Sequence, residues 1–370
     1  MRVLVVTTVH HPEDSRVRAR QIEAMLAAGW DVTYAASFSD HGLAVPDTDS
    51  LRAVDLPRAR GRHRGRALLA ARRLIRSRGA EHDIVILHDP ELLLAAIGLP
   101  NTRVVWDVHE DTVASIELKP WLPRPVRRLA GAGVHLLERW AESHVWMLLA
   151  EESYQDKYHR THLVVPNTVR VPAEVSPSGN GWAVYIGALT EARGATELIE
   201  TGRILARSSA GRVRLRLVGA APPSIATRLR EAQGEGILQW DGFLPSREAM
   251  GVLDGAAAGL SLLHDQPNYR ISMPTKVLEY MAHGVPVVTT PLPLAERIVT
   301  STGAGLVVPF GGPAATAEAV LRLADDPELR AAMAEAGRAA AGAFDWTNRS
   351  IEFLDELSRI AGSPRDALRR

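Results

Sequence analysis

Short apolar runs alternate with helical patterns along the whole chain, and this alternation constrains the fold more than any other feature. In the first half, strands are predicted at 2–8, 31–37, 83–89, 103–108 and 144–150. The segment 15–28 between the first two has a helical apolar stripe, with Ser15 as its predicted N-cap and Gly29 after its end. Strands that alternate with helices indicate βαβ units and parallel sheets.

The alternation pauses once and then restarts. The pause is the stretch VPAEVSPSGNG at 171–181, whose prolines, glycines and small polar residues predict a linker. Further strands are predicted after it at 182–187, 213–219, 237–240, 258–264, 286–290 and 305–309. We therefore expect an α/β protein with two doubly wound, Rossmann-like parallel-sheet domains that face each other across a cleft. Their predicted extents are 1–170 and 182–345, followed by a last helix at 346–370 that could pack back on the first domain.

Composition excludes several classes of protein. Acidic and basic residues number 43 each in 370 residues, so a protein that binds nucleic acid over its whole surface is excluded. Cysteine is absent, which excludes a disulfide framework, a thiolate metal site and a catalytic thiol. Nowhere do 18 apolar residues run together, and the N-terminus reaches acidic residues before an apolar run forms. We expect a soluble, cytoplasmic protein.

The most informative stretch is MPTKVLEYMAHGVPVV at 273–288. Pro274 suits the first turn of a helix, where the free backbone N–H groups of 275–278 and the helix dipole favour an anion. Lys276 adds a full positive charge there, and Glu279 could accept hydrogen bonds from two vicinal hydroxyls such as those of a ribose. The alternative is an ordinary capped helix with a solvated Lys–Glu pair.

This stretch resembles the donor-binding signature of the retaining GT-B-fold glycosyltransferases. The resemblance is to their large fourth family, which includes sucrose synthases and bacterial mannosyl- and N-acetylglucosaminyltransferases. That family has two glutamates separated by seven residues, then a helix and G-x-P-V-V. Glu279 has the position of the second glutamate, which binds the nucleotide ribose in the family, whereas Ile271 replaces the first. The replacement puts the usual contact to the donor sugar hydroxyls in doubt, although many bacterial members have a similar S-x-P-T-K-x-x-E-Y-M-A sequence.

A second match is YIGALTEARGATELI at 185–199. A basic residue before a glycine holds the diphosphate in the family, and Arg193 fits this role because a guanidinium can bind two phosphate oxygens at once. Ala188 stands where many members have a further arginine. His264 is predicted to lie at the donor sugar, and the alternative is that it is a histidine of the core. The resemblance predicts the following donor-binding residues: Gly187, Arg193, Gly219, Phe243, Leu244, His264, Pro274, Thr275, Lys276, Val277, Leu278 and Glu279.

In the first domain, two adjacent strand ends each carry a histidine among carboxylates, at HDPE (88–91) and DVHED (107–111). His109 resembles the family histidine that touches the donor sugar near its reacting carbon. With Arg193, Lys276 and Glu279 it makes up the predicted catalytic set. The loop TTVHHPEDSR (7–16) replaces the family's glycine-rich loop. The alternative for the strand ends is a pair of capped helix starts at Asp89 and Asp111. The predicted acceptor-binding residues are His10, Asp14, Arg16, Asp89, Glu110 and Asp111.

The stretch 57–79 holds nine arginines and no carboxylate, and its second half is amphipathic, with Leu68, Leu69, Leu74 and Ile75. It suits peripheral contact with an anionic membrane, on the inner membrane face, or a phosphorylated carrier acceptor. The alternative is a solvated, arginine-rich surface. Asp47 and Asp49 have D-x-D spacing but lie in a polar loop, so we predict no metal site from them.

Together, the residues and the resemblance predict a retaining, metal-independent hexosyltransferase that needs no cofactor. It would move a hexose or N-acetylhexosamine from a nucleotide diphosphate sugar to a hydroxyl acceptor. UDP is favoured as the nucleotide, with GDP and ADP open; the acceptor is a glycan, a carrier lipid or a small natural product. Two alternatives remain. One is a sugar-nucleotide epimerase of the same fold; the other is a catalytically silent sugar-nucleotide-binding protein, suggested by Ile271 and Ala188.

Overall fold

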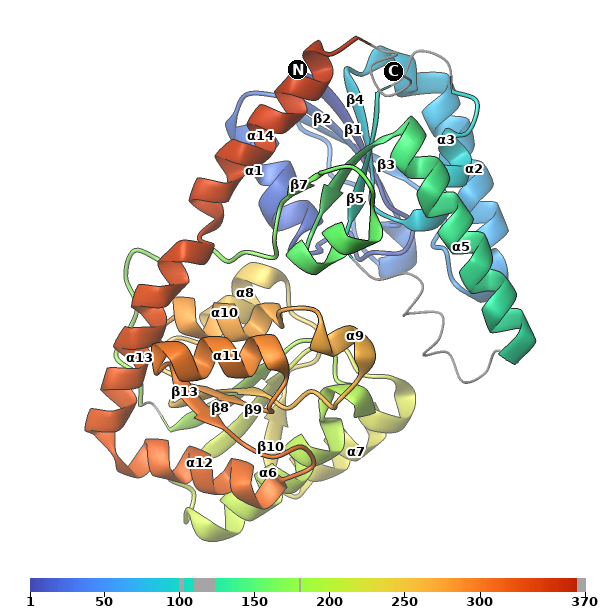
Figure 1. Cartoon of the computed structure of the whole chain (residues 1–370). Coiled ribbons are helices and arrows are strands. Elements are labelled where there is room, and N and C mark those ends of the chain that lie inside the picture. The colour runs from blue at the N-terminus through green and yellow to red at the C-terminus, as the bar shows by residue number, and fades with distance from the viewer. Residues whose placement is uncertain (100–102, 110–123, 180, 365–370) are drawn as a thin grey trace. The chain divides into compact units, whose positions relative to one another are not determined.

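The computed structural model describes residues 1–99, 103–109, 124–179 and 181–364. The chain forms two compact units (Figure 1). Unit 1 comprises Met1–Pro166 and Asn348–Arg370, and unit 2 comprises Asn167–Thr347. Each unit is built on one parallel sheet, which confirms the predicted pair of doubly wound α/β domains.

Unit 1 contains a seven-stranded sheet in the order β3-β2-β1-β4-β5-β6-β7, and all neighbouring strands run parallel. The strand order reverses direction at β1, so β1, β4 and β5 are neighbours whose carboxyl ends lie at one edge. Its strands are β1 (Arg2–Val6), β2 (Asp31–Ala36), β3 (Leu51–Asp55), β4 (Ile84–Leu87), β5 (Val104–Val108), β6 (Trp146–Leu149) and β7 (Leu163–Val164).

Helices cover both faces of this sheet. In Figure 1, α2, α3 and α5 lie on one side and α1 and α14 on the other. Their bounds are α1 (Glu23–Ala27), α2 (Arg64–Arg78), α3 (Leu93–Ala96), α5 (Arg124–His144) and α14 (Trp346–Gly362). A π-helical turn, η1 (Val17–Ile22), precedes α1. The end of α14 belongs to unit 1, where the Arg103 side chain donates hydrogen bonds to the Ser363 carbonyl oxygen.

Unit 2 contains a six-stranded parallel sheet in the order β10-β9-β8-β11-β12-β13. Its strands are β8 (Trp182–Ile186), β9 (Arg214–Val218), β10 (Leu238–Trp240), β11 (Ala258–Ser261), β12 (Val287–Thr289) and β13 (Gly305–Val307). Its helices are α6 (Ala195–Ser208), α7 (Pro223–Gly234), α8 (Ser246–Gly251), α9 (Pro267–Arg270), α10 (Thr275–Ala282), α11 (Pro293–Thr302), α12 (Pro313–Asp325) and α13 (Pro327–Ala341).

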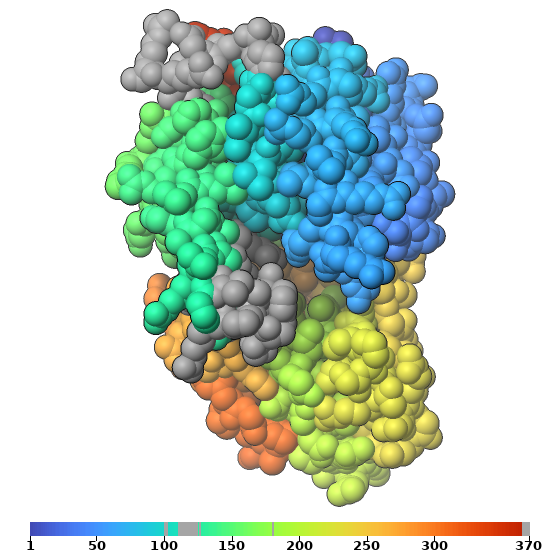
Figure 2. All heavy atoms as spheres, turned by 90° about the vertical axis from the view of Figure 1, so that its right-hand side faces the viewer, coloured from blue at the N-terminus to red at the C-terminus, as the bar shows by residue number. Residues whose placement is uncertain are grey.

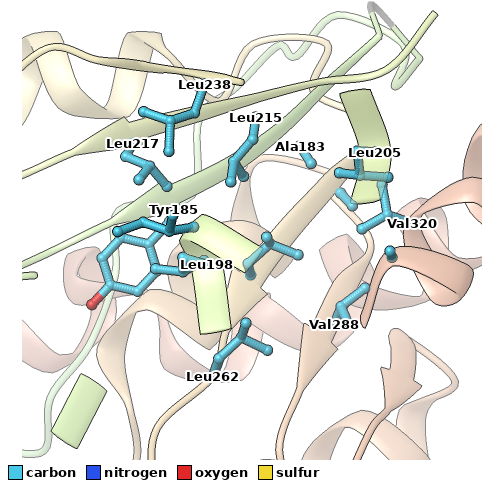
Figure 3. Close-up of a cluster of buried hydrophobic side chains, with 14 of the residues drawn as sticks. Ala183, Tyr185, Leu198, Leu205, Leu215, Leu217, Leu238, Leu262, Val288 and Val320 are labelled. Carbon is cyan, nitrogen blue, oxygen red and sulfur yellow. The ribbon is translucent and has the colours of Figure 1, made fainter. Parts of the chain in front are cut away.

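The core of unit 2 has two layers, one on each face of the sheet. On one face, Leu198 of α6 and Val320 of α12 pack against strand residues such as Leu215 (Figure 3). On the other face, residues of α8, α10 and α11 pack against Val184 and Val287. Because both faces are covered, the central strands are continuously apolar, which is why they were predictable as short apolar runs.

Three features differ from the sequence-based expectation. The chain passes from unit 1 to unit 2 between Pro166 and Asn167, before the predicted linker. The stretch 171–181 lies in unit 2, where the Ser176 backbone N–H and hydroxyl both donate to Asp254. Ser15 does not cap the first helix; the Asp14 carboxylate instead accepts from the N–H groups of Arg16 and Val17.

The helix α2 also differs in detail from its prediction. Its core side consists of Ala67, Ala71 and Ile75, whereas Leu69 is 56% exposed. None of the helices in the described part of the chain is both long and apolar enough to cross a bilayer.

Candidate functional site

A buried ion pair lies at the carboxyl edge of the sheet in unit 1. The Arg16 guanidinium donates from Nε to Asp107 Oδ2 at 2.9 Å and from Nη2 to Asp107 Oδ1 at 2.7 Å. Gln21 Nε2 also donates to Asp107 Oδ2, at 2.9 Å. Asp107 lies in β5, while Arg16 and Gln21 come from the loop and turn that follow β1. The pair therefore joins two strand ends of the sheet.

Electrostatics makes this pair charged in spite of its burial. Burial alone would raise the pKa of the Asp107 carboxyl, but the Arg16 guanidinium holds that pKa well below its usual range. Burial would lower the pKa of Arg16, and the Asp107 charge raises it. A bidentate guanidinium–carboxylate pair with a further amide donor compensates for much of the cost of burying two charges.

Two histidine rings meet beside this pair. His10 Nε2 lies 2.8 Å from His109 Nε2, and the ring planes are inclined at 60°. His109 Nδ1 lies 3.1 Å from the backbone carbonyl oxygen of Asp107. His109 follows β5 directly, and His10 lies in the loop after β1. The loops after β1 and β5, the two strands that flank β4 in the sheet, therefore bring the two rings together.

Asp89 holds the loop that carries His10. Its carboxylate accepts from the hydroxyls of Thr7 and Thr8 and from the backbone N–H groups of Thr8 and Val9. His10 Nε2 is 3.5 Å from Asp89 Oδ1. The interpretation of Asp89 as a helix cap is wrong, because its side chain makes no capping hydrogen bond to the turn that follows it.

His88, Asp107 and His109 are the one group of three metal-ligating side chains within reach of a common ion in the described part of the chain. The Asp107 oxygens already accept from Arg16 and Gln21, so an ion there would lie against a guanidinium. His88 is fully buried, and burial lowers its pKa; its Nδ1 is 3.2 Å from Asp107 Oδ2 without the geometry of a hydrogen bond. These contacts fit a charged hydrogen-bond network and do not fit a divalent cation.

The structure brings together most of the residues predicted on the acceptor side. His10, Asp14, Arg16, Asp89 and His109 all surround the carboxyl edge formed by β1, β4 and β5. Asp14 has a lowered pKa, because the His10 charge and two backbone N–H groups outweigh the effect of burial. Glu110 and Asp111 lie outside the described residues.

Sequence reasoning did not predict Gln21 as a member of this network, and it noted His88 and Asp107 at the strand ends without assigning them a partner or a role. The available signal was Asp107 itself. A carboxylate inside an otherwise apolar parallel strand needs a cationic partner, so it should have prompted a search for an arginine.

In unit 2, a buried lysine at the start of α10 lies beside the end of β8. Lys276 is 7% exposed and lies in the first turn of α10. Its Nζ is 4.0 Å from the centre of the Tyr185 ring and has no hydrogen-bond partner among the residues that the structure describes. Burial and the nearby Arg193 charge together hold the pKa of Lys276 well below its ordinary value, against the opposing effect of Glu279.

The glycine loops next to Lys276 are packed closely. A Cβ at Gly187 would lie 3.4 Å from Lys276 Nζ, so the ammonium faces the backbone that follows β8. Gly219, after β9, has φ 146°, and a Cβ there would collide with the Gly187 carbonyl group. Packing therefore explains why Gly219 is glycine, and its predicted role beside the nucleotide remains a prediction.

Pro274 is the N-cap residue of α10, and it makes no side-chain capping hydrogen bond. The side chains of Val277 and Leu278 are fully buried in the core, so only their backbone groups are available to a ligand. Thr275 and Glu279 are half-buried on the same helix. Arg193 ends the turn η7 (Glu191–Arg193), followed by Gly194 in the left-handed conformation.

The remaining predicted donor residues lie at other positions in unit 2. Phe243 is 47% exposed after β10, and the side chain of Leu244 packs against the core. His264 forms a hydrogen-bonded pair with Glu197, with Nε2 3.0 Å from Oε1. This pair gives His264 a structural role, and the alternative of a core histidine does not hold, because its side chain is 33% exposed.

Comparison with known proteins connects this geometry to one enzyme family. Residues 181–326 match the family model described as glycosyl transferases group 1. Over 301 residues the chain is 24% identical to the phosphatidyl-myo-inositol mannosyltransferase of Mycobacterium leprae, a match that covers 76% of this chain and 75% of that protein.

Solved structures show the same fold. Sucrose-phosphate synthase from Thermosynechococcus elongatus superposes with a TM-score of 0.71 at 15% identity, over 97% of this chain and 98% of that chain. Anabaena HepE in complex with UDP-glucose gives a TM-score of 0.70 at 13% identity, over 97% of this chain and 100% of that chain. The chain thus has the GT-B fold of two doubly wound sheets, and its residues 181–326 are similar to the group 1 glycosyl transferases.

Proposed function

We propose that the protein is a retaining glycosyltransferase that moves a hexose or N-acetylhexosamine from a nucleotide diphosphate sugar to a hydroxyl acceptor. UDP is the proposed nucleotide, since HepE, a protein of the same fold, has UDP-glucose bound in its solved structure. The mannosyltransferase of M. leprae supports a hexose as the transferred group.

The observation that carries this proposal is Lys276. A buried ammonium without a hydrogen-bond partner is unfavourable in the free protein, and an anion would compensate it. The N-terminus of α10 and the Arg193 side chain add positive potential close by. Two cations and a helix start match the charge of a diphosphate group.

In the proposed reaction, an acceptor hydroxyl oxygen attacks C1 of the donor sugar while the bond from C1 to the diphosphate oxygen breaks. The leaving diphosphate takes the proton of the acceptor on the same face of the sugar, which retains the configuration. Arg193, Lys276 and the start of α10 stabilise the growing charge on the diphosphate. Glu279 holds the ribose, and His109 orients the donor sugar.

The proposed reaction needs neither a metal ion nor a cofactor. Arg193 and Lys276 supply the positive charge that a divalent cation supplies in other transferases. The cluster of His88, Asp107 and His109 is occupied by its ion pair with Arg16. Release of nucleotide diphosphate should therefore continue at full rate in excess EDTA.

The test starts with binding and proceeds to turnover. UDP, GDP and ADP are titrated into the full chain by calorimetry, and release of nucleotide diphosphate from the matching sugar donors is then followed with cell-extract acceptors. Acceptor-dependent release supports a transferase. Conversion of the donor to another sugar nucleotide without an acceptor would indicate an epimerase, and binding without turnover would indicate a silent binding protein. If none of the three nucleotides binds, the proposal is wrong.

Lys276→Met and Lys157→Met form a matched pair for this test. Lys157 is an exposed lysine of unit 1, in the turn η6 (Glu152–Lys157). Loss of a charge-assisted contact to the diphosphate should weaken nucleotide binding by at least about tenfold in Lys276→Met, and leave it unchanged in Lys157→Met.

We further propose that unit 1 acts on an acceptor at an anionic bilayer surface. The outer side of α2 carries Arg66, Arg73 and Arg76, which are exposed and have no ion pair with any described residue. Their spacing places the three guanidinium groups within one stripe of the helix. The other arginines of α2 are different, since Arg64 pairs with Glu91 and Arg72 donates to carbonyl oxygens at the end of α3.

Apolar side chains adjoin this basic stripe. Leu69 lies within it and is 56% exposed, and Leu94 and Ile97 of the neighbouring α3 region are 43% and 41% exposed. Arg72 ties this region to α2. The outer surfaces of α2 and α3 belong to the blue and cyan face of unit 1 in Figure 2. Basic and apolar side chains on one helical face favour the boundary between lipid headgroups and acyl chains.

Vesicle binding tests this second proposal. The full chain should co-sediment with phosphatidylglycerol vesicles and much less with phosphatidylcholine vesicles. The variant Arg66→Glu/Arg73→Glu should lose at least about tenfold in vesicle affinity, since each cation near the surface contributes about 1 kcal/mol. The control Arg297→Glu/Arg322→Glu reverses two exposed charges of unit 2 and should bind normally. Equal losses in both variants, or binding to RNA in preference to vesicles, would overturn it.

A further inference from the structure

The contact between His10 and His109 indicates which ring nitrogens of the two histidines carry protons. A distance of 2.8 Å between two ring nitrogens is a hydrogen bond, so one Nε2 carries the proton and the other accepts it. Which nitrogen donates is decided by what the other ring nitrogen of His109 contacts.

His109 Nδ1 lies close to two oxygens of Asp107, and both of them can only accept a hydrogen bond. It lies 3.1 Å from the Asp107 backbone oxygen and 3.7 Å from Asp107 Oδ2. Neither oxygen can donate, so the proton of His109 lies on Nδ1. His109 Nε2 is then the acceptor, and His10 Nε2–H is the donor.

The structure fixes His10 in the orientation that this donor role requires. The Thr7 hydroxyl accepts from the His10 backbone N–H at 3.1 Å and itself donates to Asp89 Oδ1 at 3.0 Å. Asp89 is fully buried, and its other oxygen accepts from Thr8 and Val9. The His10 side chain is 18% exposed, and Asp89 Oδ1 lies 3.5 Å from its Nε2.

We propose that His10 is a positioning residue for His109. In the absence of a donor, the His10 Nε2–H occupies the acceptor nitrogen of His109 and keeps the His109 proton on Nδ1. When a nucleotide sugar binds, a hydroxyl of the donor sugar takes the place of His10 and donates to the same nitrogen. This inference rests on the proposed transferase function for its second step, whereas the first step concerns the free protein.

The consequence for specificity is that His109 recognises the sugar as an acceptor of hydrogen bonds. A sugar carbon that bears a hydroxyl at this point satisfies Nε2, and one that bears only hydrogen leaves a partly buried nitrogen without its partner. The loop that carries His10 takes the place of a glycine-rich loop. In this chain the His10 side chain would therefore fix His109, a task that the backbone of the glycine-rich loop is expected to perform.

Nitrogen NMR of the full chain labelled with ¹⁵N-histidine tests the first step without any substrate. We expect a protonated Nδ1 and a bare Nε2 for His109, a protonated Nε2 for His10, and a scalar coupling between the two Nε2 nuclei. His10→Gln and His109→Gln assign the signals, and His135→Gln, at an exposed position of α5, is the control. A protonated Nε2 on His109 in the free protein would overturn the proposal.

Kinetics tests the second step. His10→Phe keeps a ring of similar shape but has no donor, whereas His10→Gln can still donate to His109. His10 contacts His109 only in the free protein, where it holds the proton of His109 on Nδ1. We therefore expect the KM for the donor sugar to rise by about tenfold in His10→Phe, the effect of one lost hydrogen bond, and to stay within about threefold in His10→Gln, while kcat is unchanged in both. Nucleotide affinity should be unchanged in both variants, since the nucleotide is assigned to unit 2. An equal change of the donor KM in the two variants would contradict a role for the His10 proton.

The two arms separate this inference from the proposed function. If no nucleotide binds to the wild type, the transferase proposal fails while the NMR result still decides the positions of the protons. If transfer occurs but the protons lie elsewhere, the transferase proposal stands and the role of His10 is wrong.

Discussion

The Arg16 guanidinium and the Asp107 carboxylate form a bidentate ion pair in which Arg16 is 7% exposed and Asp107 is fully buried. The pair connects the loop after β1 to β5, and His109 follows two residues after Asp107. The same contacts that stabilise unit 1 therefore set the backbone position of the proposed sugar-contacting histidine. Arg16 was predicted to bind the acceptor; its bonds to Asp107 give it this structural task.

Removing one partner of this pair should be more harmful than removing both. Arg16→Leu leaves a buried carboxylate without its cation and should lower the free energy of unfolding of unit 1 by about 3–5 kcal/mol. The double variant Arg16→Leu/Asp107→Leu removes both charges and should cost clearly less than the sum of the single variants. Urea unfolding at pH 7 measures both effects. Additive single and double effects would show that the two groups are not coupled.

The same pair predicts how stability depends on pH. The folded pKa of Asp107 lies well below that of an unfolded aspartate, about 3.9. A carboxyl group with a depressed folded pKa contributes stability above its unfolded pKa, and this contribution is lost as the pH falls through the folded pKa. Wild-type protein should therefore lose more stability between pH 5 and 3 than Asp107→Asn does. Urea unfolding across this range measures the slope, and identical slopes would contradict the ionised state of Asp107.

Most of the fold could be predicted from the sequence because its central strands are buried on both faces. Such strands are apolar throughout, so 2–8 and 182–187 were recognisable, and the structure has β1 and β8 there. The edge strand β3 was missed, because an exposed edge allows Arg52 and Asp55 into the strand. The position of the linker was missed because prolines and glycines also suit a segment that packs on a domain surface through Ser176 and Arg330.

The candidate site was predictable only in its parts. Strand ends identified His109 and Asp89, since parallel strands place their carboxyl ends at one edge, and the predicted helix start after Pro274 identified Lys276. The partners of these residues could not be predicted, because the pairing of Arg16 with Asp107 depends on side chains 91 positions apart in the chain. The contact between His10 and His109 depends in the same way on how two loops pack.

Lys276 should lower the stability of the ligand-free protein. Burial of its ammonium without a hydrogen-bond partner opposes folding, so Lys276→Met should raise the melting temperature of the free protein while it weakens nucleotide binding. A gain of about 1 kcal/mol corresponds to about 2–4 °C in a unit of this size. Differential scanning fluorimetry with and without UDP measures both effects. A lower melting temperature in Lys276→Met, with Lys157→Met unchanged, would contradict this account of Lys276.

Nucleotide binding should take up a proton at alkaline pH. The pKa of Lys276 is well below its ordinary value in the free protein, and a bound diphosphate would raise it again. Between the two pKa values, affinity should fall as the pH rises, because the neutral amine must first gain a proton. Calorimetry at pH 8.5 in two buffers of different ionisation enthalpy counts the protons, well above the pH at which free UDP titrates. Wild type should take up a proton and Lys276→Met none; equal uptake in both would rule out Lys276 as the group that titrates.

Gly194 should tolerate no side chain. It has φ 82°, a conformation that costs a residue with a Cβ about 1–2 kcal/mol, and a Cβ there would collide with the Leu262 carbonyl group. Gly211 has φ 80° with open space around it, so Gly211→Ala should lower stability by the conformational cost alone, without a steric collision. Gly194→Ala should therefore lose clearly more stability than Gly211→Ala in urea unfolding. It should also weaken nucleotide binding, since the shift moves Arg193, the residue before Gly194. Equal costs at the two glycines would mean that the turn can move away from Leu262, and Arg193 would then not depend on a fixed backbone.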